Sequence, residues 1–364
     1  MPHSRSRISL LLAVALLAVA ACGSPHPATT LKASTSPTVG SSSAPAATPT
    51  PTPAPLTTPL LVQVENLYVA RPQSGLSSAN IVYEYQTEGG ITRFTGIWYS
   101  LPPAADLVGP VRSARPVDLR LLQIYDGVLL YSGASNYTLA QLNSSDLRQY
   151  SPDDAVVGST VLYRVSSASA PPSLQGAPHN LYSNGAELAS FEQKIGMGPV
   201  AYHLWSRTPV TSLPAGGTAA TSFQVPISPA EAPIFTYDTT SGAYQRSEPA
   251  TSYPGTGTLD DANTKAPWET PNVAILQVPV ITVTADNEDS SNVPWVDGLD
   301  FGIGPNASGT GQLAVGGQLY TITWTQGASG PPQFTLANGQ PAPIAPGQVM
   351  IELVAQGVTV TPQS

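Results

Sequence analysis

The chain has 364 residues, a formal net charge of −9 and one cysteine. This length suggests about two domains, and the acidic charge argues against nucleic acid as a partner and against electrostatic attraction to anionic lipid. A lone cysteine excludes an intramolecular disulfide, so any folded domain must be stabilised by its core.

The first 21 residues have the parts of a bacterial export signal. Arg5 and Arg7 supply the positive start, and residues 8–21 form an almost wholly apolar run. That run is shorter than the ~20 residues of a membrane-spanning helix but suits a signal peptide. The sequence VAAC at 19–22 resembles a lipobox, which predicts cleavage before Cys22 and lipidation of its thiol. The alternative is an ordinary signal peptide with an incidental cysteine.

Residues 22–58 are predicted to be the lipidated cysteine and a disordered tether. The segment is rich in Pro, Ser and Thr, and its one charge is Lys32. Such a composition cannot bury enough apolar surface to fold, and the Thr-Pro repeat at 48–55 favours extended polyproline II. We therefore expect the folded part to stand off the extracytoplasmic face of the cell membrane. A leader without a spacing role is the alternative.

Residues 59–207 predict a mixed α/β domain. Short apolar runs and helix-period patterns distinguish its strands from its helices. The helices carry start and stop signals, Pro116 with Gly127 for the first and Ser183 or Asn184 with Gly196 for the second. Strands are expected at residues 60–65, 81–88, 91–100 and 128–131.

Two of these strands are expected to form a hairpin across residues 89–90. A Gly-Gly pair favours a two-residue loop, which would place Tyr85 opposite Phe94 on a face of aromatic residues. The opposite face would then carry the charged residues Glu84, Glu88 and Arg93.

Residues 208–232 are predicted to be a linker, and residues 233–364 a smaller, mostly antiparallel β domain. Turn residues such as the Gly-Gly pair at 316–317 and the Asn-Gly pair at 338–339 separate short strand patterns there. The predicted fold class is therefore α+β, with the mixed domain first. The strands are expected at residues 234–237, 243–246, 273–283, 313–315, 319–322, 334–336 and 349–354.

Six motifs stand out along the chain: ARPQSGL (70–76), IVYE (81–84), EGGITR (88–93), GPVRSAR (109–115), APHNL (177–181) and, more loosely, FTYD (235–238). Together they resemble the YerB-like family of bacterial lipoproteins, which carry paired N- and C-terminal domains of unknown function. The resemblance implies two domains and a lipoprotein location, and it implies no reaction. The chain departs from the family pattern at Asn80, where an acidic residue is typical.

Arg112 and Arg115 form the first candidate site. They lie in a loop that leads into the helix expected from Pro116, whose N-terminus offers unpaired backbone N–H groups. Two guanidinium groups beside such an end suit a phosphate or a carboxylate. The alternative is internal pairing with acidic residues, namely Glu84, Glu88 or Asp118.

The other candidates are the carboxylates Glu84 and Glu88 and the pair His179–Asn180. Positions four apart on a strand lie ~13 Å apart, which is wide for an acid/base pair, and Arg93 between them favours ionised, structural carboxylates. His179 could act as a general base, although a histidine beside an asparagine also suits a loop organiser. No metal-ligand spacing or phosphate-binding glycine loop is present, so neither a metal nor a cofactor is predicted.

These observations favour a non-enzymatic binding or accessory lipoprotein of the cell envelope. Its partner would be a cell-wall polymer or an envelope protein, with the membrane contacted through the lipid. The alternative is an enzyme acting on cell-wall material, with His179 as general base and Arg112 and Arg115 as anion clamp. A purely structural lipoprotein is the third possibility.

Overall fold

The computed structural model describes residues 56–165, 178–249, 257–287 and 297–363. The chain divides into residues 1–52 and a compact unit of residues 53–364, and all that follows concerns this compact unit. Cys22, the predicted signal peptide and all but the last three residues of the predicted tether lie outside the described residues. Among the helices described, none has the length and apolar character needed to cross a membrane.

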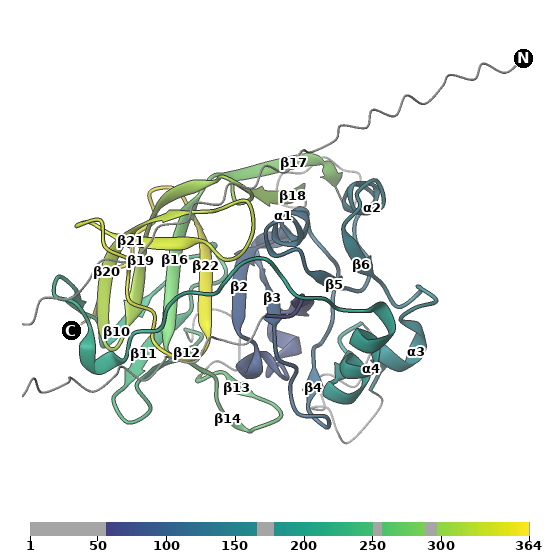
Figure 1. The fold of residues 1–364 in the computed structure, drawn as a ribbon, viewed down its shortest axis with the longest axis horizontal. Helices are drawn as coiled ribbons and strands as arrows, with labels where there is room; N and C mark the ends of the chain where they lie inside the picture. Colours follow the sequence, from purple (N-terminus) through teal and green to yellow (C-terminus); the bar gives the residue numbers. More distant parts are fainter. Residues whose placement is uncertain (1–55, 166–177, 250–256, 288–296, 364) are drawn as a thin grey trace, which may run out of the picture. The chain divides into compact units, whose positions relative to one another are not determined.

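An eleven-stranded sheet runs through both halves of the compact unit (Figure 1). Strand β22 comes from the end of the chain, yet it lies between β16 and β2 and pairs in parallel with both. In spatial order the strands are β21 (Gln333–Leu336), β20 (Gln318–Thr325), β19 (Ser308–Val315), β16 (Asn272–Val278), β22 (Val349–Ala355), β2 (Ile81–Gln86), β3 (Thr92–Trp98), β1 (Leu60–Glu65), β5 (Val128–Leu130) and β6 (Arg148–Tyr150), with β9 (Thr218–Ala219) paired to β20.

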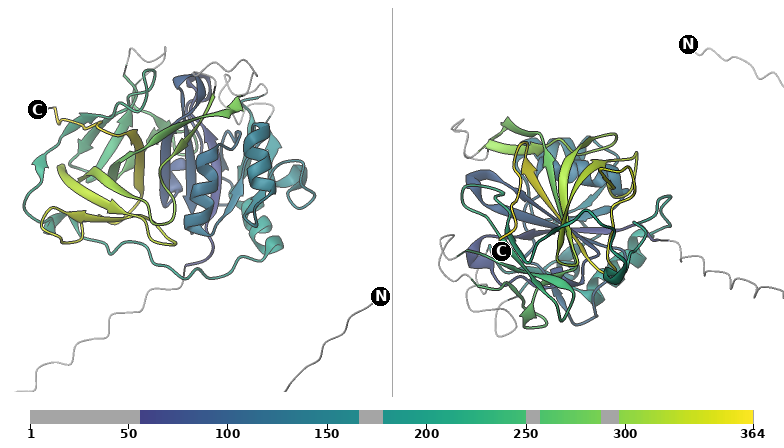
Figure 2. Two further views of the ribbon diagram at one scale, coloured as in Figure 1. Left: turned by 90° about the horizontal axis from the view of Figure 1, so that it is seen from above. Right: turned by 90° about the vertical axis from the view of Figure 1, so that its left-hand side faces the viewer.

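Both faces of this sheet are covered, so each strand buries its two sets of alternating side chains. One face packs on α1 (Pro116–Tyr125), α2 (Asn136–Asn143) and the aromatic residues Tyr202 and Trp205. The other face packs on a small sheet and on α4 (Gly185–Ile195) (Figure 2). The small sheet consists of β10 (Ser222–Gln224), β11 (Ile234–Asp238), β12 (Ala243–Ser247) and β15 (Glu269–Thr270).

The remaining elements are short and lie around these layers. They are β4 (Leu107–Val108), β7 (Tyr163–Arg164) and β8 (Leu181–Asn184) in one sheet, α3 (Gly158–Val161), the pairs β13 (Asp260–Asp261) with β14 (Ala266–Pro267) and β17 (Val280–Asn287) with β18 (Asp297–Phe301), and 3-10 turns at Tyr68–Ala70, Leu76–Ser78, Glu88–Gly90 and Val210–Ser212. Strands outnumber helices, so the mixed α/β character expected from the sequence is confirmed.

The predicted register of the β2–β3 hairpin is wrong by one residue. Its loop contains three residues, Glu88–Gly90, because the Thr87 N–H donates to the Ile91 carbonyl at 2.7 Å. Tyr85 therefore lies opposite Arg93, and Glu84 lies opposite Phe94. A slip of one residue moves every side chain to the other face, so Glu84 does not share a face with Arg93.

Two other expectations need correction. The long strand predicted at 273–283 is broken at Pro279, which has no N–H for a strand ladder, and it forms β16 and β17. In α1 the apolar pattern predicts a stripe of Leu119, Leu122 and Tyr125, but the buried stripe also includes Leu121 and Ile124, and Leu119 is only partly buried. By contrast, α4 begins after Asn184, which caps the Glu187 N–H, and ends at Gly196 with a φ of 67°, as expected.

Candidate functional site

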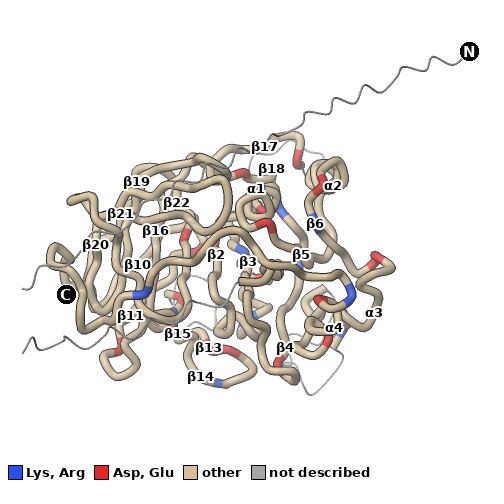
Figure 3. The backbone as a smooth tube through the Cα atoms, in the orientation of Figure 1, with Lys and Arg blue, Asp and Glu red and all other residues tan. Residues whose placement is uncertain are grey.

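The sequence-predicted site residues separate into three charged groups. Figure 3 shows Lys, Arg, Asp and Glu distributed over the fold, with several beside β2 and β3. Because of the corrected register, Glu84 lies on the face toward the small sheet. The other charged candidates lie near the loop end of β2 and β3 and the end of β1.

The first group, here called the Glu65 group, consists of Glu65, Arg112 and His179. Glu65 ends β1, and its carboxylate is 3% exposed. Nδ1 of His179 lies 2.9 Å from Oε2 of Glu65, and Nε of Arg112 lies 3.4 Å from Oε1. The His179 and Arg112 side chains are 22% and 23% exposed. A buried carboxylate thus holds two partly exposed cationic or polar side chains.

Backbone pairing brings the Glu65 group together. The Arg112 N–H donates to the Gln63 carbonyl at 2.9 Å, and Val111 forms a bridge with Val64, so this loop extends the edge of β1. The Val111 N–H donates in turn to the Leu181 carbonyl, which ties the loop to the segment after His179.

Tyr182 adds an unusual feature beside this group. Its hydroxyl is buried and has no hydrogen-bond partner among the described residues. Burial raises the pKa of Tyr182, and the Glu65 carboxylate raises it further. The raised pKa keeps the Tyr182 hydroxyl neutral, so it retains its proton as a hydrogen-bond donor.

The second group, here called the Glu88 group, consists of Glu88, Arg93 and Arg115. Arg115 forms a two-pronged ion pair with Glu88, with its Nε 2.7 Å from Oε2. Its remaining nitrogen donates to the Ser113 and Ala114 carbonyls, and Arg93 also donates to Ser113. The Arg115 side chain is only 4% exposed. This group fixes the loop that leads into α1.

Asp118 completes the start of α1. Its carboxylate accepts the Arg115 N–H at 2.7 Å and the Thr95 hydroxyl at 3.0 Å. Burial nevertheless raises the pKa of Asp118 to about 6. The alternative expected for the two arginines was internal pairing with acidic residues. Arg115 is paired in this way, with Glu88 as its main partner.

The third group is a buried ionic network that the sequence did not reveal. Glu84 accepts two hydrogen bonds from Nη2 of Arg246, at 2.9 and 2.8 Å. Arg246 lies on β12, so this ion pair links the large sheet to the small one, and its guanidinium also lies 5.2 Å from the centre of the Phe94 ring. We call the following set the buried network: Arg71, Glu84, Glu231, Arg246, Glu248 and Glu352.

Carboxylates outnumber guanidinium groups in the buried network. Burial raises the pKa of Glu84, Glu231 and Glu352, to about 7 in the case of Glu231, in spite of the ion pair with Arg71. Glu352 lies directly across from Glu84 in the β2–β22 pairing, and its oxygens have no hydrogen-bond partner among the described residues. Burial and the adjacent Glu84 carboxylate hold the pKa of Glu352 well above its ordinary value, because two ionised carboxylates side by side in the interior repel each other.

Asn180 is held by its neighbours. Its side chain accepts from Arg164 at 2.9 Å and donates to the Val165 carbonyl at 3.1 Å. These contacts position the backbone beside His179. Within the described residues, no group of His, Cys, Asp and Glu has the arrangement of a metal site.

Sequence reasoning missed Glu65 and the members of the buried network other than Glu84. A usable signal existed for some of them, because charged residues make up only 10% of the chain. Arg71 lies in one of the recognised motifs, and Glu65 ends a strand whose other residues are mostly apolar. Arg246 and Glu352 gave no such signal. Glu352 reaches Glu84 because β22 pairs with β2, and Arg246 reaches it because β12 packs on the large sheet.

The fold and these groups define a strand-rich α/β protein whose two halves share one sheet. Residues 47–197 match the N-terminal domain, and residues 223–351 the C-terminal domain, of the family described as "Protein of unknown function (DUF3048)". The chain belongs to this family, and the resemblance to YerB-like proteins is confirmed.

Two comparisons with individual proteins agree with this assignment. "Putative lipoprotein YerB" of Bacillus subtilis (strain 168) is 46% identical over 86 residues, which are 24% of this chain and 25% of that protein. The crystal structure of YerB from Bacillus subtilis superposes with a TM-score of 0.63 at 24% identity, covering 85% of this chain and 99% of that one. At this identity the likeness shows the fold alone.

Proposed function

We propose that this protein is a lipoprotein anchored through Cys22 on the extracytoplasmic face of the cell membrane, and that its folded part binds an anionic group of an envelope polymer or protein. The lipobox-like sequence and the relative named as a lipoprotein support the anchor. The apolar run of the leader, which suits a signal peptide, supports export. The acidic composition makes the lipid, rather than surface charge, the means of membrane attachment.

The binding proposal rests on one observation. Arg112 and His179 both contact the buried Glu65 carboxylate, and both side chains remain partly exposed. Glu65 restricts both side chains, so little conformational entropy remains to be lost when a ligand binds. Arginine recognises carboxylate and phosphate groups through paired N–H donors. Arg115 differs, because its side chain is almost buried, at 4% exposed.

Labelling cells with radioactive palmitate tests the anchor. The wild-type protein should incorporate label and sediment with membranes, whereas Cys22→Ala should do neither. Label retained in Cys22→Ala would contradict the anchor.

Capture of purified cell-wall fragments and envelope proteins by the lipidated protein in detergent tests the binding role. Arg112→Ala should lose the captured partner. Arg120→Ala is the matched control, since Arg120 is more exposed and, among the described residues, its ion pair is with Asp300 on the α1 side. Equal capture by both variants would contradict the assignment of the ligand to the Glu65 group.

A second candidate function is an enzyme acting on cell-wall material. It is favoured by the contact between Nδ1 of His179 and the Glu65 carboxylate, which would orient the ring and leave Nε2 available as a general base. Among the described arginines, Arg112 contacts this carboxylate, so Arg112 rather than Arg115 would serve as the anion clamp. Hydrolysis of muropeptides that disappears in His179→Ala but persists in His203→Ala, with both variants folded, would establish this function in place of simple binding.

A further inference from the structure

Within the part of the chain that the structure describes, strand β17 has a neighbour on one edge only. It pairs antiparallel with β18, and no other described strand pairs with it. Figure 1 shows this two-stranded ribbon at the margin of the fold, where β17 runs toward α2. The outer edge of β17 therefore lacks the neighbour that an inner strand of a sheet has.

The pairing with β18 shows which backbone groups of β17 point outward. The Gly302 N–H donates to the Pro279 carbonyl at 2.8 Å, so these two residues face each other's strand. Hydrogen-bonded pairs alternate with non-hydrogen-bonded pairs along an antiparallel ladder. The next hydrogen-bonded pair contains Ile281, whereas Val280 and Thr282 turn their N–H and carbonyl groups away from β18. Groups that point outward are not part of the β17–β18 ladder, so Val280 and Thr282 are placed to pair with a further strand.

The side chains along this edge also suit a further strand. Residues 280–284 are all β-branched, the type that packs well on a pleated surface, and none of them is charged. Ile281 is 53% exposed, and Val280 is 39% exposed. Proteins usually protect such an edge with a charge, a proline or a bulge. Here Pro279 precedes the run and the register with β18 shifts after Val283, so the protection lies at the two ends and leaves the middle open.

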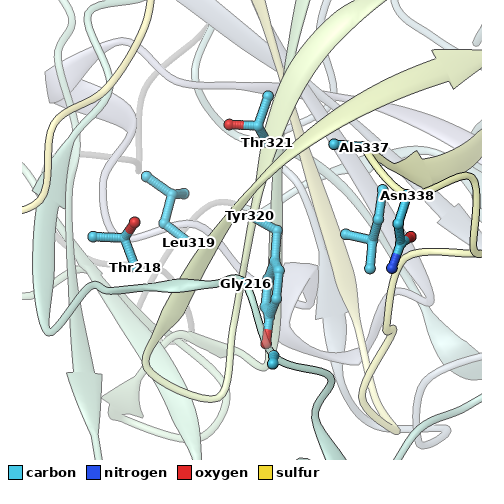
Figure 4. Close-up of a pocket in the computed structure, with 9 residues that line it drawn as sticks. Gly216, Thr218, Leu319, Tyr320, Thr321, Ala337 and Asn338 are labelled. Carbon is cyan, nitrogen blue, oxygen red and sulfur yellow. The ribbon is translucent and has the colours of Figure 1, made fainter.

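The outer edges of the large sheet differ from that of β17. Along the outer edge of β20 lie β9 and β21, and the β21 register, continued by one residue, places Ala337 opposite Thr321. The hollow of about 330 Å³ beside Tyr320 in Figure 4 thus adjoins strands that are already paired. At the other end of the large sheet, β6 is three residues long and contains Arg148, and both features discourage pairing with another chain.

We propose that β17 pairs with β17 of a second copy of this chain, antiparallel about a two-fold axis at Ile281. The span between Pro279 and the register shift after Val283 is centred on this residue, so both copies offer the same open segment. Val280 of each copy would lie opposite Thr282 of the other, and their outward N–H and carbonyl groups would bond to each other. Ile281 would meet its own copy in a non-hydrogen-bonded pair, where side chains lie closest.

The small size of this contact gives the membrane a part in the pairing. A stable interface involves ~20–30 residues on each side, so a contact over residues 279–283 should be weak in free solution. This inference rests on the proposed anchor, because the predicted tethers, residues 22–58, would hold both copies near one membrane and raise their effective concentration. A partner free in solution gains no such advantage, which favours a second copy as the occupant of this edge.

Cysteine cross-linking on liposomes tests the proposal. The lipidated protein is floated with liposomes and oxidised with copper phenanthroline, while the lipid occupies the thiol of Cys22. Ile281→Cys should form a disulfide-linked dimer, because facing Cα atoms of a non-hydrogen-bonded pair lie ~4.5 Å apart. In Val280→Cys the equivalent positions lie two residues apart along different strands, beyond the ~7 Å limit for a disulfide, so cross-linking should be at least about tenfold slower.

Val210→Cys is the matched control, since Val210 is as exposed as Val280 but lies outside β17. Floated Ile281→Cys protein that cross-links no faster than Val210→Cys would overturn the proposal and leave the anchor intact. Protein that does not float would contradict the anchor and, with it, this inference.

A charge exchange distinguishes a second copy from a different partner. Ile281→Lys and Ile281→Asp each place like charges opposite each other across the axis, so energy transfer between dye-labelled copies on liposomes should fall at least about fivefold. An equal mixture of the two variants should recover it, because lysine then faces aspartate. Arg112→Ala should behave as the wild type does, since it leaves β17 unchanged. Unchanged transfer in Ile281→Lys, or a mixture without recovery, as expected if the edge binds a strand of another protein, would overturn the proposal.

Discussion

The Glu65 group and the buried network both combine arginine with carboxylate, yet they differ in solvent access. Arg246 and Glu84 are 1% and 0% exposed, whereas Arg112 and His179 each keep about a fifth of their surface in water, at 23% and 22%. A buried ion pair is enclosed by packed layers, and no ligand can reach it without unfolding. A partly exposed pair on a buried carboxylate can exchange one partner for a ligand.

The ion pairs of the buried network and those of the Glu65 group therefore have separate roles in this fold. The buried network links the large sheet to the small one and joins residues of the two halves of the chain, because Glu84 contacts Arg246 and Arg71 contacts Glu231. Removal of one member leaves an uncompensated charge in the interior, so it should act on stability. Removal of a member of the Glu65 group should act on binding.

The largest expected effect is that of Arg246→Met. This change leaves Glu84 buried without its guanidinium partner and leaves Glu248 with the longer contact to Arg71, at 3.5 Å, which should lower the free energy of unfolding by about 3–5 kcal/mol. Chemical denaturation followed by tryptophan fluorescence measures it. Arg120→Ala is the control, expected to cost at most about 1 kcal/mol, since its side chain is 43% exposed. A loss below about 1 kcal/mol in Arg246→Met would mean that the network is not a structural link.

The pH dependence of stability gives the next effect. The pKa of Glu231 is raised from its ordinary value to about 7, so the folded protein holds this proton more tightly than the unfolded chain does. Its contribution to stability is fully present below about pH 4.5 and is lost as the pH rises through about 7, by about 3 kcal/mol. Glu231→Gln should remove this part of the slope in denaturation measured between pH 4.5 and 8. An unchanged slope would show that Glu231 is ionised throughout.

A smaller effect is expected for Arg115→Lys. Lysine keeps the charge but cannot form the two-pronged contact with Glu88 or reach both loop carbonyls, so unfolding should become easier by about 1 kcal/mol. Arg112→Lys should cost less, because the contact of Arg112 with Glu65 is longer, at 3.4 Å, and its side chain is partly exposed. If Arg115→Lys and Arg112→Lys lowered the free energy of unfolding equally, the stronger pairing of Arg115 would not contribute to stability, contrary to this prediction.

The comparison of two Gly-Gly loops shows what sequence could predict. Gly316 and Gly317 form the expected two-residue loop, with Val315 opposite Gln318, whereas the loop that contains Gly89 and Gly90 has three residues. A strand with one polar face would have fixed the register through its hydrophobic pattern. In β2 both faces are buried, so the pattern suits either register, and the prediction relied on the loop alone.

The charged residues show a second limit. The sequence identified Arg112, Arg115 and His179 as candidates through local motifs, and the structure shows the carboxylates they contact, Glu65 and Glu88. It could not reveal the buried network, because its contacts depend on pairing between distant parts of the chain. Local signals predicted helix ends and many of the turns well, since capping and turn chemistry involve neighbours in sequence.

The most direct test of the account compares Arg112→Ala with the wild type in two measurements on the same protein. The free energy of unfolding should change by less than about 1 kcal/mol, because Arg112 is partly exposed and makes one long contact with Glu65. The affinity for the captured envelope fragment should fall at least about tenfold. Unchanged affinity in a stably folded Arg112→Ala protein would contradict the claim that the Glu65 group is the binding site.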